Sequence, residues 1–446
     1  MNDKWSNQSK PDCSLSIATK PSDRRIDSVE MAHLTKMKES SYDYLGVIAA
    51  SSALAIGVGL QRTELAVLGN MMVEAKWINS DNIGQLVGLN LAGYLAGCVH
   101  QTRIKREDQS LRMIRIALIV CVAIFFIEPL FPSMGWNTIW RLISGWGCAH
   151  LVTGLPGFGT RKLHPDQKRL AMGIIFAGAG IAPLLDSVLL PFFVKNSPVA
   201  AWNFTGLFSI LFAIPIWMLI SRGLIEERDE KLSHQAATNS PSPTSQSNTN
   251  DGKSVSGGID WSPALKIFAL TTLLYGASQV SILTYQPLYV TSVFKVSSEV
   301  ASNSFALVGF GYTLGAIIAG LVPKKIPTDS VLLTSVAIGT FGTCLFVFTP
   351  VLSIVNFGAF LFAFWNGAYI GLIVARLTEV VGPHVVRPAW ALFSFLLSIG
   401  FVSMTFIAGY ISTFSVPMIF YVGLALVVIN LVLMSITAYS FKKQSL

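Results

Sequence analysis

The sequence predicts an all-α membrane protein with twelve transmembrane helices, arranged as two halves of six helices each. Three observations support this fold class: the apolar composition, the length of the apolar runs and an internal repeat. Of the 446 residues, 52% are hydrophobic and 13% are charged, and the mean hydropathy is +0.57. Because soluble domains carry about 25% charged residues, we expect most of this chain to face lipid or other helices.

The long apolar runs set the number of spans. A helix needs about 20 apolar residues to cross a hydrocarbon core of about 30 Å. Two stretches contain no Asp, Glu, Lys or Arg: 46 residues from Ser330 to Ala375, and 54 residues from Pro388 to Phe441. Each is too long for one span and contains a turn signal, so each predicts a helical hairpin. The predicted spans are 44–70, 82–100, 112–131, 136–160, 169–194, 200–221, 262–288, 300–322, 330–349, 352–376, 388–411 and 417–440.

The distribution of basic residues predicts the orientation. With the N-terminus inside, the cytoplasmic segments hold 27 of the 32 Lys and Arg residues. The predicted outer loops hold Lys76, Lys195 and Lys295, while Arg62 and Arg141 lie within spans. This imbalance places both termini in the cytoplasm. Because the basic residues form short clusters between apolar runs and no continuous basic face, we expect a lipid bilayer as the partner and no nucleic acid.

Composition also predicts the domain boundaries. Residues 1–43 are polar and lack the apolar core of a signal peptide, which predicts a cytoplasmic tail. Residues 44–221 form the predicted N-terminal half, and 262–441 the C-terminal half. Between them, 222–261 are rich in Ser, Asn, Pro and Gly, which predicts a disordered cytoplasmic linker. Residues 442–446 form a short cytoplasmic tail.

The two halves share an internal repeat. The segment GYLAG at Gly93–Gly97 recurs as GYTLG at Gly311–Gly315, at an offset of 218 residues. Two further matches lie at an offset of 219: Trp146 with Trp365, and Lys105–Arg106 with Lys324–Lys325. Three matches at nearly one offset predict a duplicated six-helix unit. The five cysteines are scattered without metal-binding spacing, so we expect buried thiols, no disulfide framework, and no metal or cofactor.

These features resemble the major facilitator superfamily over residues 44–441. The resemblance rests on six plus six spans, a long middle loop and basic pairs after spans two and eight. The segment NLAGYLAG in span two, with an arginine late in span one, resembles the YbfB/YjiJ-type bacterial branch. The superfamily's loop signature is met at Gly97, Lys105 and Arg106, but Gln101, Thr102 and Ile104 replace its Asp, Arg and Gly. The resemblance implies a gating loop formed by Gly97, Lys105, Arg106, Lys324 and Lys325.

The resemblance implies a secondary active transporter that works by alternating access, is not an enzyme, and is a monomer in the bacterial inner membrane. We find no ATP-binding motif, so the expected energy source is an ion gradient, with protons as the coupling ion. Two arginines in the first half favour a small organic anion as substrate, because guanidinium binds carboxylates with two hydrogen bonds. A proton-driven exporter of amphipathic drugs or metabolites is the first alternative, and a non-transporting scaffold is a remote one. Span five matches the antiporter signature at Gly178 and Pro183 only, so the direction of transport stays open.

In such a fold, the resemblance implies that spans one, four, seven and ten line the central cavity. The candidate substrate-binding residues are Arg62, Arg141, Trp146, Gln279, Tyr285, Trp365, Asn366 and Tyr369. The candidate proton-coupling residues are Asp186, Glu64 and His150.

Each candidate also has a structural interpretation. We expect Asp186 to hold Arg62 or exchange protons with it, but Asp186 with either arginine could instead be a structural ion pair. Glu64 could reach the outer headgroups, and His150 could be a packing residue. The two candidate tryptophans could pack inside the helix bundle rather than line the cavity.

Overall fold

The computed structural model describes residues 44–104, 106–161, 163, 165–193, 197–238, 261–323, 325–382 and 386–444. The secondary structure of these residues is helical, with no strand among them. Residues from Leu45 onward form one compact unit. The predicted tail at 1–43 lies outside the described residues.

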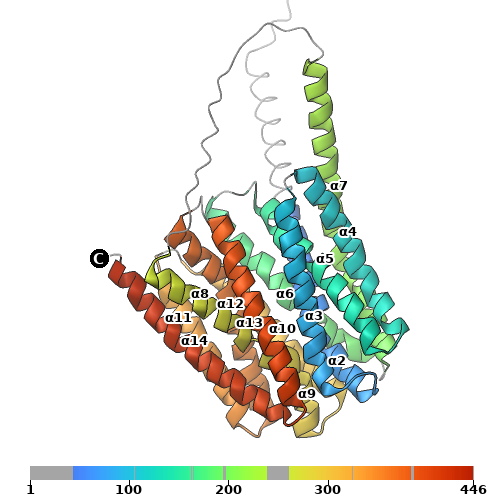
Figure 1. Cartoon of the computed structure of the whole chain (residues 1–446), viewed down its shortest axis with the longest axis vertical. Coiled ribbons are helices and arrows are strands. Elements are labelled where there is room, and N and C mark those ends of the chain that lie inside the picture. Colours follow the sequence, from blue (N-terminus) through green and yellow to red (C-terminus); the bar gives the residue numbers. More distant parts are fainter. Residues whose placement is uncertain are drawn as a thin grey trace, which may run out of the picture. The chain divides into compact units, whose positions relative to one another are not determined.

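The helices follow the predicted spans closely (Figure 1). Residues 44–54 are helical, and the elements that follow are η1 (Ala55–Thr63), α2 (Leu65–Glu74), α3 (Ser80–Arg103), α4 (Glu107–Ile127), η2 (Glu128–Leu130), α5 (Met134–Thr160), α6 (Pro165–Phe193), α7 (Pro198–Thr238), α8 (Pro263–Ser278), α9 (Val280–Phe294), α10 (Ser298–Leu321), α11 (Thr328–Phe348), α12 (Leu352–Val381), α13 (Val386–Ser412) and α14 (Val416–Gln444).

Ten helical segments of the described chain are long and apolar enough to cross a membrane. The first of them joins residues 44–54, η1 and α2, and another joins α8 and α9. The other two predicted spans correspond to α3 and α5, which have 24 and 27 residues. At 1.5 Å per residue, even 24 residues reach about 36 Å, which exceeds the hydrocarbon core. Both are less apolar because they carry many glycine and polar residues.

Small residues bring the helices of each half together in the same way twice. The pairs α3–α5 in the first half and α10–α12 in the second are among the most extensive contacts. A Cβ atom on Gly93 would lie 2.0 Å from the carbonyl oxygen of Leu142, and one on Gly315 would lie 2.0 Å from that of Phe364. The repeated GYxxG segments are therefore positions where two helix backbones touch, as small residues permit within membranes.

The halves meet along two helix pairs, α6 with α10 and α3 with α13; Figure 1 shows α3 beside α13. We call the end of the bundle with loops 75–79, 295–297 and 413–415 the predicted outer end. There, Thr291 Oγ1 donates a hydrogen bond to Asn70 Oδ1 at 3.2 Å, and the Ser298 hydroxyl donates to Glu74. The two halves are thus joined by side chains at the predicted outer end.

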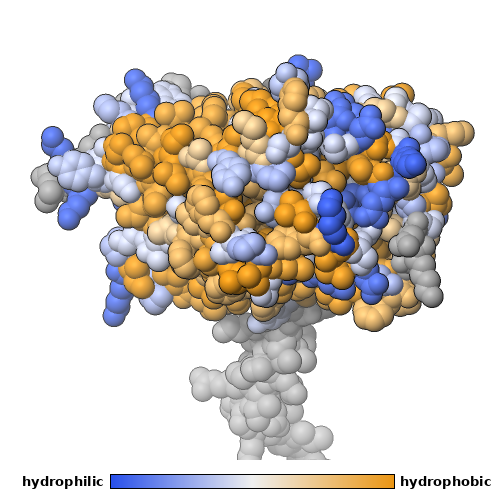
Figure 2. Space-filling view, turned by 90° about the horizontal axis from the view of Figure 1, so that it is seen from below, coloured by the Kyte–Doolittle hydropathy of each residue, from blue (hydrophilic) through white to orange (hydrophobic). Residues whose placement is uncertain are grey.

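Exposed apolar side chains cover the helix surfaces. Ile119, Leu211, Phe341, Phe357 and Val432 are each more than half exposed, although water would disfavour them. Figure 2 views the molecule from below, onto the predicted outer end, where hydrophilic patches lie among hydrophobic residues. Lipid is the solvent that suits the exposed apolar side chains on the helices.

The first part of the predicted linker is helical. Helix α7 continues to Thr238, beyond Arg222, where the linker was expected to start (Figure 1). Residues 239–260 of the predicted linker lie outside the described part of the chain. At the other terminus, α14 runs to Gln444, slightly past the predicted end of the C-terminal half at 441.

Candidate functional site

The first span is interrupted in its middle by a π-helix. Within η1 and at its end the backbone uses longer hydrogen bonds, and the N–H of Glu64 donates to the carbonyl of Gly59 at 2.8 Å. Span seven is interrupted at Gln279, between α8 and α9. Gln61 in η1 and Gln279 lie 218 positions apart, the offset of the internal repeat. π-Turns are frequent at functional sites, and helices broken at corresponding positions of two repeats point to a binding site.

Arg62 is a half-buried cation in the broken first span. Its Nε and Nη2 atoms are buried and make no hydrogen bond. Its guanidinium carbon lies 5.1 Å from the centroid of the Tyr94 ring, a cation–π contact. It also interacts electrostatically with Tyr312 of the second half. Tyr94 and Tyr312 are equivalent residues of the GYxxG repeat, so Arg62 lies near one tyrosine from each half.

Glu64 and Asp186 form a buried acidic pair. Both side chains are fully buried and close enough to interact electrostatically. The Ser187 hydroxyl donates to both carboxylate oxygens of Glu64 at 3.2 Å, and Thr205 Oγ1 donates to Asp186 Oδ2 at 2.8 Å. Asp186 Oδ1 is buried without a hydrogen-bond partner.

This arrangement corrects two expectations. Within the described chain no ion pair joins Arg62 to Asp186, whose carboxylate lies beside Glu64 instead. Glu64 does not face outward to headgroups, because its side chain is fully buried and accepts hydrogen bonds from Ser187. Asp186 therefore accepts a hydrogen bond from Thr205 and interacts electrostatically with a second carboxylate, that of Glu64.

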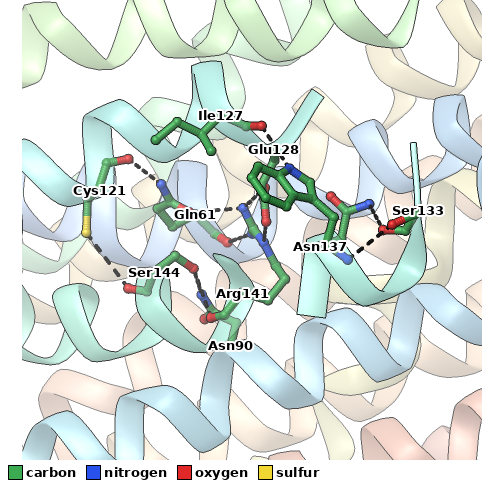
Figure 3. Close-up of polar contacts among 10 residues, drawn as sticks. Gln61, Asn90, Cys121, Ile127, Glu128, Ser133, Asn137, Arg141 and Ser144 are labelled. Carbon is green, nitrogen blue, oxygen red and sulfur yellow. Dashed lines mark hydrogen bonds and ion pairs between the residues drawn. The ribbon is translucent and has the colours of Figure 1, made fainter. Parts of the chain in front are cut away.

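Arg141 lies on the other side of η1, in a fully buried network (Figure 3). Its Nε donates to Glu128 Oε1 at 2.5 Å and its Nη2 to Glu128 Oε2. Its Nη1 donates to the backbone carbonyl of Gln61 at 2.9 Å, and its guanidinium carbon is 5.1 Å from the Trp202 ring centroid. The guanidinium is therefore held by Glu128 and Gln61 within the protein, and the geometry favours a structural role for Arg141 over substrate binding.

The aromatic candidates of the second half pack inside that half. Trp365 and Tyr369 are fully buried, and the Tyr275 ring lies 5.4 and 4.5 Å from theirs. A Cβ on Gly339 would lie 2.5 Å from the Trp365 ring, so this ring is pressed against α11. Asn366 is also fully buried, and its Nδ2 donates to the Phe362 carbonyl at 2.9 Å. The structure therefore favours packing over a cavity wall for these three candidates.

Two candidates in span seven have different positions. Gln279 is at the helix break, where its Nε2 donates to the Tyr275 carbonyl at 3.4 Å. Tyr285 lies near the predicted outer end, and a Cβ on Gly84 of α3 would lie 2.2 Å from its hydroxyl oxygen. Tyr285 therefore belongs to the contact between the halves, whereas Gln279 stays a candidate for the central site.

His150 belongs to a hydrogen-bonded cluster between α3 and α5. Its Nε2 is 3.1 Å from His100 Nδ1, and its Nδ1 is 2.5 Å from Gln101 Oε1. Trp146 Nε1 donates to His100 Nδ1 at 3.3 Å. Because both ring nitrogens of His150 have protein partners, the geometry favours a packing role for His150 and Trp146.

The predicted gating loop is described only in part, because Lys105 and Lys324 lie outside the described residues. Gly97 is a helix contact, since a Cβ there would lie 2.6 Å from the Trp146 carbonyl oxygen. Arg106 binds Asp108 with two hydrogen bonds of 3.1 Å, and Lys325 is exposed. A gating role for this loop stays a prediction.

Four residues of the site were missed by the sequence analysis: Gln61, Tyr94, Glu128 and Tyr312. The offset of 218 could have found three of them, since it pairs Gln61 with Gln279 and Tyr94 with Tyr312. No such signal identifies Glu128, whose equivalent is Phe346.

Among the described residues, no cluster of three or more His, Cys, Asp or Glu side chains could hold a metal ion, and the four described cysteines are free.

Two helical halves, each with a broken first helix, and a half-buried cation near a tyrosine of each half point to a multi-pass membrane transporter. The family model described as "Uncharacterised MFS-type transporter YbfB" matches residues 54–435. The chain therefore belongs to this family of the major facilitator superfamily.

Solved structures support the same fold. A bacterial homologue of the human lysosomal transporter Spinster, in an inward-facing and unoccupied conformation, has a TM-score of 0.58 and 16% identity, covering 89% of this chain and 96% of its own. The inward-facing and occupied conformation has the same TM-score and identity, covering 90% of this chain and 96% of its own. Comparison with curated proteins gave no match. At this identity the likeness concerns the fold alone.

Proposed function

We propose that this protein is a proton-coupled secondary transporter of a small organic anion, with Arg62 as the residue that binds the anion. The observation that carries the proposal is the unpartnered guanidinium of Arg62, with two buried nitrogens free of hydrogen bonds. A buried cation is costly unless an opposite charge or water compensates it. A carboxylate is the natural ligand, because it accepts two parallel hydrogen bonds from the guanidinium.

The position of Arg62 suits a transported ligand. It is attached to the broken first span and lies near Tyr94 of the first half and Tyr312 of the second. A substrate bound there is within reach of both halves. In alternating access the two halves rock about such a shared site.

Glu64 and Asp186 are the proposed proton carriers. Two carboxylates buried side by side, without a cation between them, cannot both be charged at low cost. We infer that the pair shares a proton. Because Glu64 is two residues from Arg62 on the same broken helix, movement of that helix on anion binding would change the pair's surroundings and its affinity for the proton.

The contacts at the predicted outer end support alternating access. Asn70–Thr291 and Glu74–Ser298 join the halves there, and Tyr285 packs against Gly84 beside them. These few polar contacts would have to separate when the site opens outward. In this proposal the structure represents the state that is closed at the predicted outer end.

The alternative function, export of amphipathic drugs, requires a hydrophobic cavity lined by the aromatic candidates. Because Trp365 and Tyr369 pack within the second half, no observation on the described residues now favours that alternative. Counterflow with a cationic dye tests drug export directly.

Counterflow in proteoliposomes tests the proposal. The wild-type protein should exchange at least one of radiolabelled lactate, succinate or benzoate, and should not exchange rhodamine 6G. Arg62→Ala and Arg62→Lys should both raise the KM, because lysine keeps the charge but loses the planar fork. Arg112→Ala, which removes an exposed arginine of α4, is the matched control. Exchange of the dye alone, or unchanged acid exchange by Arg62→Ala, would overturn the proposal.

A further inference from the structure

The buried ion pair of Arg141 and Glu128 holds the residue that precedes Arg62. Arg141 Nη1 donates to the Gln61 carbonyl at 2.9 Å, and Arg141 Nη2 donates to Gln61 Oε1 at 3.3 Å. The Gln61 side chain is held from its other atom too, since Nε2 donates to the Cys121 carbonyl at 2.5 Å. Gln61 is thus fixed through its backbone and through both polar atoms of its side chain (Figure 3).

Because of the position of Gln61 in the helix, its contact with Arg141 also affects the direction of the Arg62 side chain. Gln61 lies in the last turn of η1, where helix carbonyls lack partners within the helix. Arg141 supplies such a partner. Because successive residues of a helix face different directions, Gln61 faces α4 and α5 while Arg62 faces Tyr94. A clamp on Gln61 therefore also fixes the direction in which Arg62 leaves the helix.

The second half shows that the fold does not require the ion pair. At an offset of 218, Arg141 corresponds to Ala359, Glu128 to Phe346 and Trp202 to Phe420. There, Phe346 and Phe420 stack with their ring centroids 4.8 Å apart. Apolar packing thus fills the place that the ion pair takes in the first half, and buried ion pairs can often be replaced in this way.

The ion pair occurs in the half that contains Arg62, whose equivalent in the other half is Val280. We propose that Arg141 and Glu128 are positioning residues, which orient Arg62 toward the substrate by clamping Gln61 at the end of the π-helix. This inference rests on the proposed function, in which Arg62 binds the anion.

The second half supplies the variant that tests the inference. In Arg141→Ala/Glu128→Phe/Trp202→Phe, the first half receives the residues of the second. We expect the melting temperature to stay close to that of the wild type, while the counterflow KM for the best-exchanged acid rises about 10- to 100-fold, because a misplaced binding group costs affinity. The maximal rate should change much less. A folded triple variant with the wild-type KM would overturn the inference.

A single substitution tests the inference even if the triple variant does not fold. Gln61→Met keeps the side-chain length but removes the amide that Arg141 and the Cys121 carbonyl hold. We expect this variant to raise the KM, whereas Gln286→Met should not. Gln286 is a buried glutamine of α9 that donates to Ser304 Oγ at 2.8 Å, and no hydrogen bond within the described chain joins it to Gln61, Arg62 or Arg141. Equal KM values for the two glutamine variants would contradict the inference.

Arg62→Ala, measured beside these variants, separates the two proposals. If its KM is unchanged, Arg62 does not bind the anion and the proposed function fails. If Arg62→Ala raises the KM but Gln61→Met and the triple variant do not, the proposed function stands and only the positioning role fails.

Discussion

The two halves share one helical framework but fill equivalent positions with different chemistry. In the first half, Arg141, Glu128 and Trp202 form a buried charged network, whereas the second half has Ala359, Phe346 and Phe420 at these positions. Likewise, Arg62 and Glu64 correspond to Val280 and Ile282. The framework depends on features that both halves keep, such as the GYxxG helix contacts. At these equivalent positions the ionic residues occur in the first half and not in the second, which is the basis of the proposal that they serve transport.

Removing one partner of the ion pair should have the largest effect on stability. Arg141→Ala leaves Glu128 buried without its cation, and we expect the free energy of unfolding to fall by about 3–5 kcal/mol. Thermal unfolding in detergent measures this change. The triple variant with second-half residues should recover most of the loss. An unchanged free energy of unfolding in Arg141→Ala would mean that Arg141 and Glu128 do not form a buried ion pair.

The aromatic cluster of the second half should behave as packing. Trp365→Ala should lower the free energy of unfolding by about 3–5 kcal/mol, because it leaves a cavity against α11. Trp365→Phe should cost less and leave the KM for the transported acid unchanged. Thermal unfolding and counterflow on the same preparations distinguish the two roles. A raised KM in a stable Trp365→Phe protein would indicate that Trp365 contacts the substrate.

Much of the framework could be predicted from the sequence, because span length, charge and the repeat are set by the bilayer and by duplication. The predicted end of α5 at 160 and the start of α12 at 352 agree with the structure. The pairing of intramembrane charges was not predictable in the same way. Side-chain direction depends on helix phase, and the π-helix from Ala55 to Thr63 changes that phase ahead of Glu64.

The environment of Arg141 was unpredictable for a different reason. Its partner Glu128 lies at the end of a predicted span, in a three-residue turn that periodicity does not reveal. The sequence could not decide between packing and a cavity wall for the aromatic candidates, because a tryptophan or tyrosine in an apolar helix has the same pattern whether it faces a cavity or a neighbouring helix. Only the contact with Gly339 shows that Trp365 faces α11.

The acidic pair should affect coupling more than substrate exchange. Asp186→Asn and Glu64→Gln remove the charge that a proton would neutralise, so uptake driven by a proton gradient should be lost while counterflow persists. Met404, the equivalent of Asp186 in the second half, offers the control variant Met404→Leu, which should preserve coupling. Uptake with and without an imposed pH gradient measures the effect. Normal gradient-driven accumulation by both acidic variants would contradict the proton-carrier role.

The smallest expected effect concerns the two tyrosines of the repeat. Tyr312→Phe and Tyr94→Phe each remove one hydroxyl near Arg62 and keep the ring. If the anion accepts a hydrogen bond from both halves, each variant should raise the KM about two- to tenfold, the range for one hydrogen bond. An effect of Tyr94→Phe alone would confine substrate binding to the first half.

The most direct measurement of the central claim is calorimetric titration of the best-exchanged acid into purified protein, in buffers of different ionisation enthalpy. The account predicts that wild-type protein binds the anion with uptake of a proton, that Arg62→Ala and Arg62→Lys weaken binding about 10- to 100-fold, and that Asp186→Asn binds without proton uptake. Binding of the acid with wild-type affinity by Arg62→Ala, or proton uptake that persists in Asp186→Asn, would contradict it.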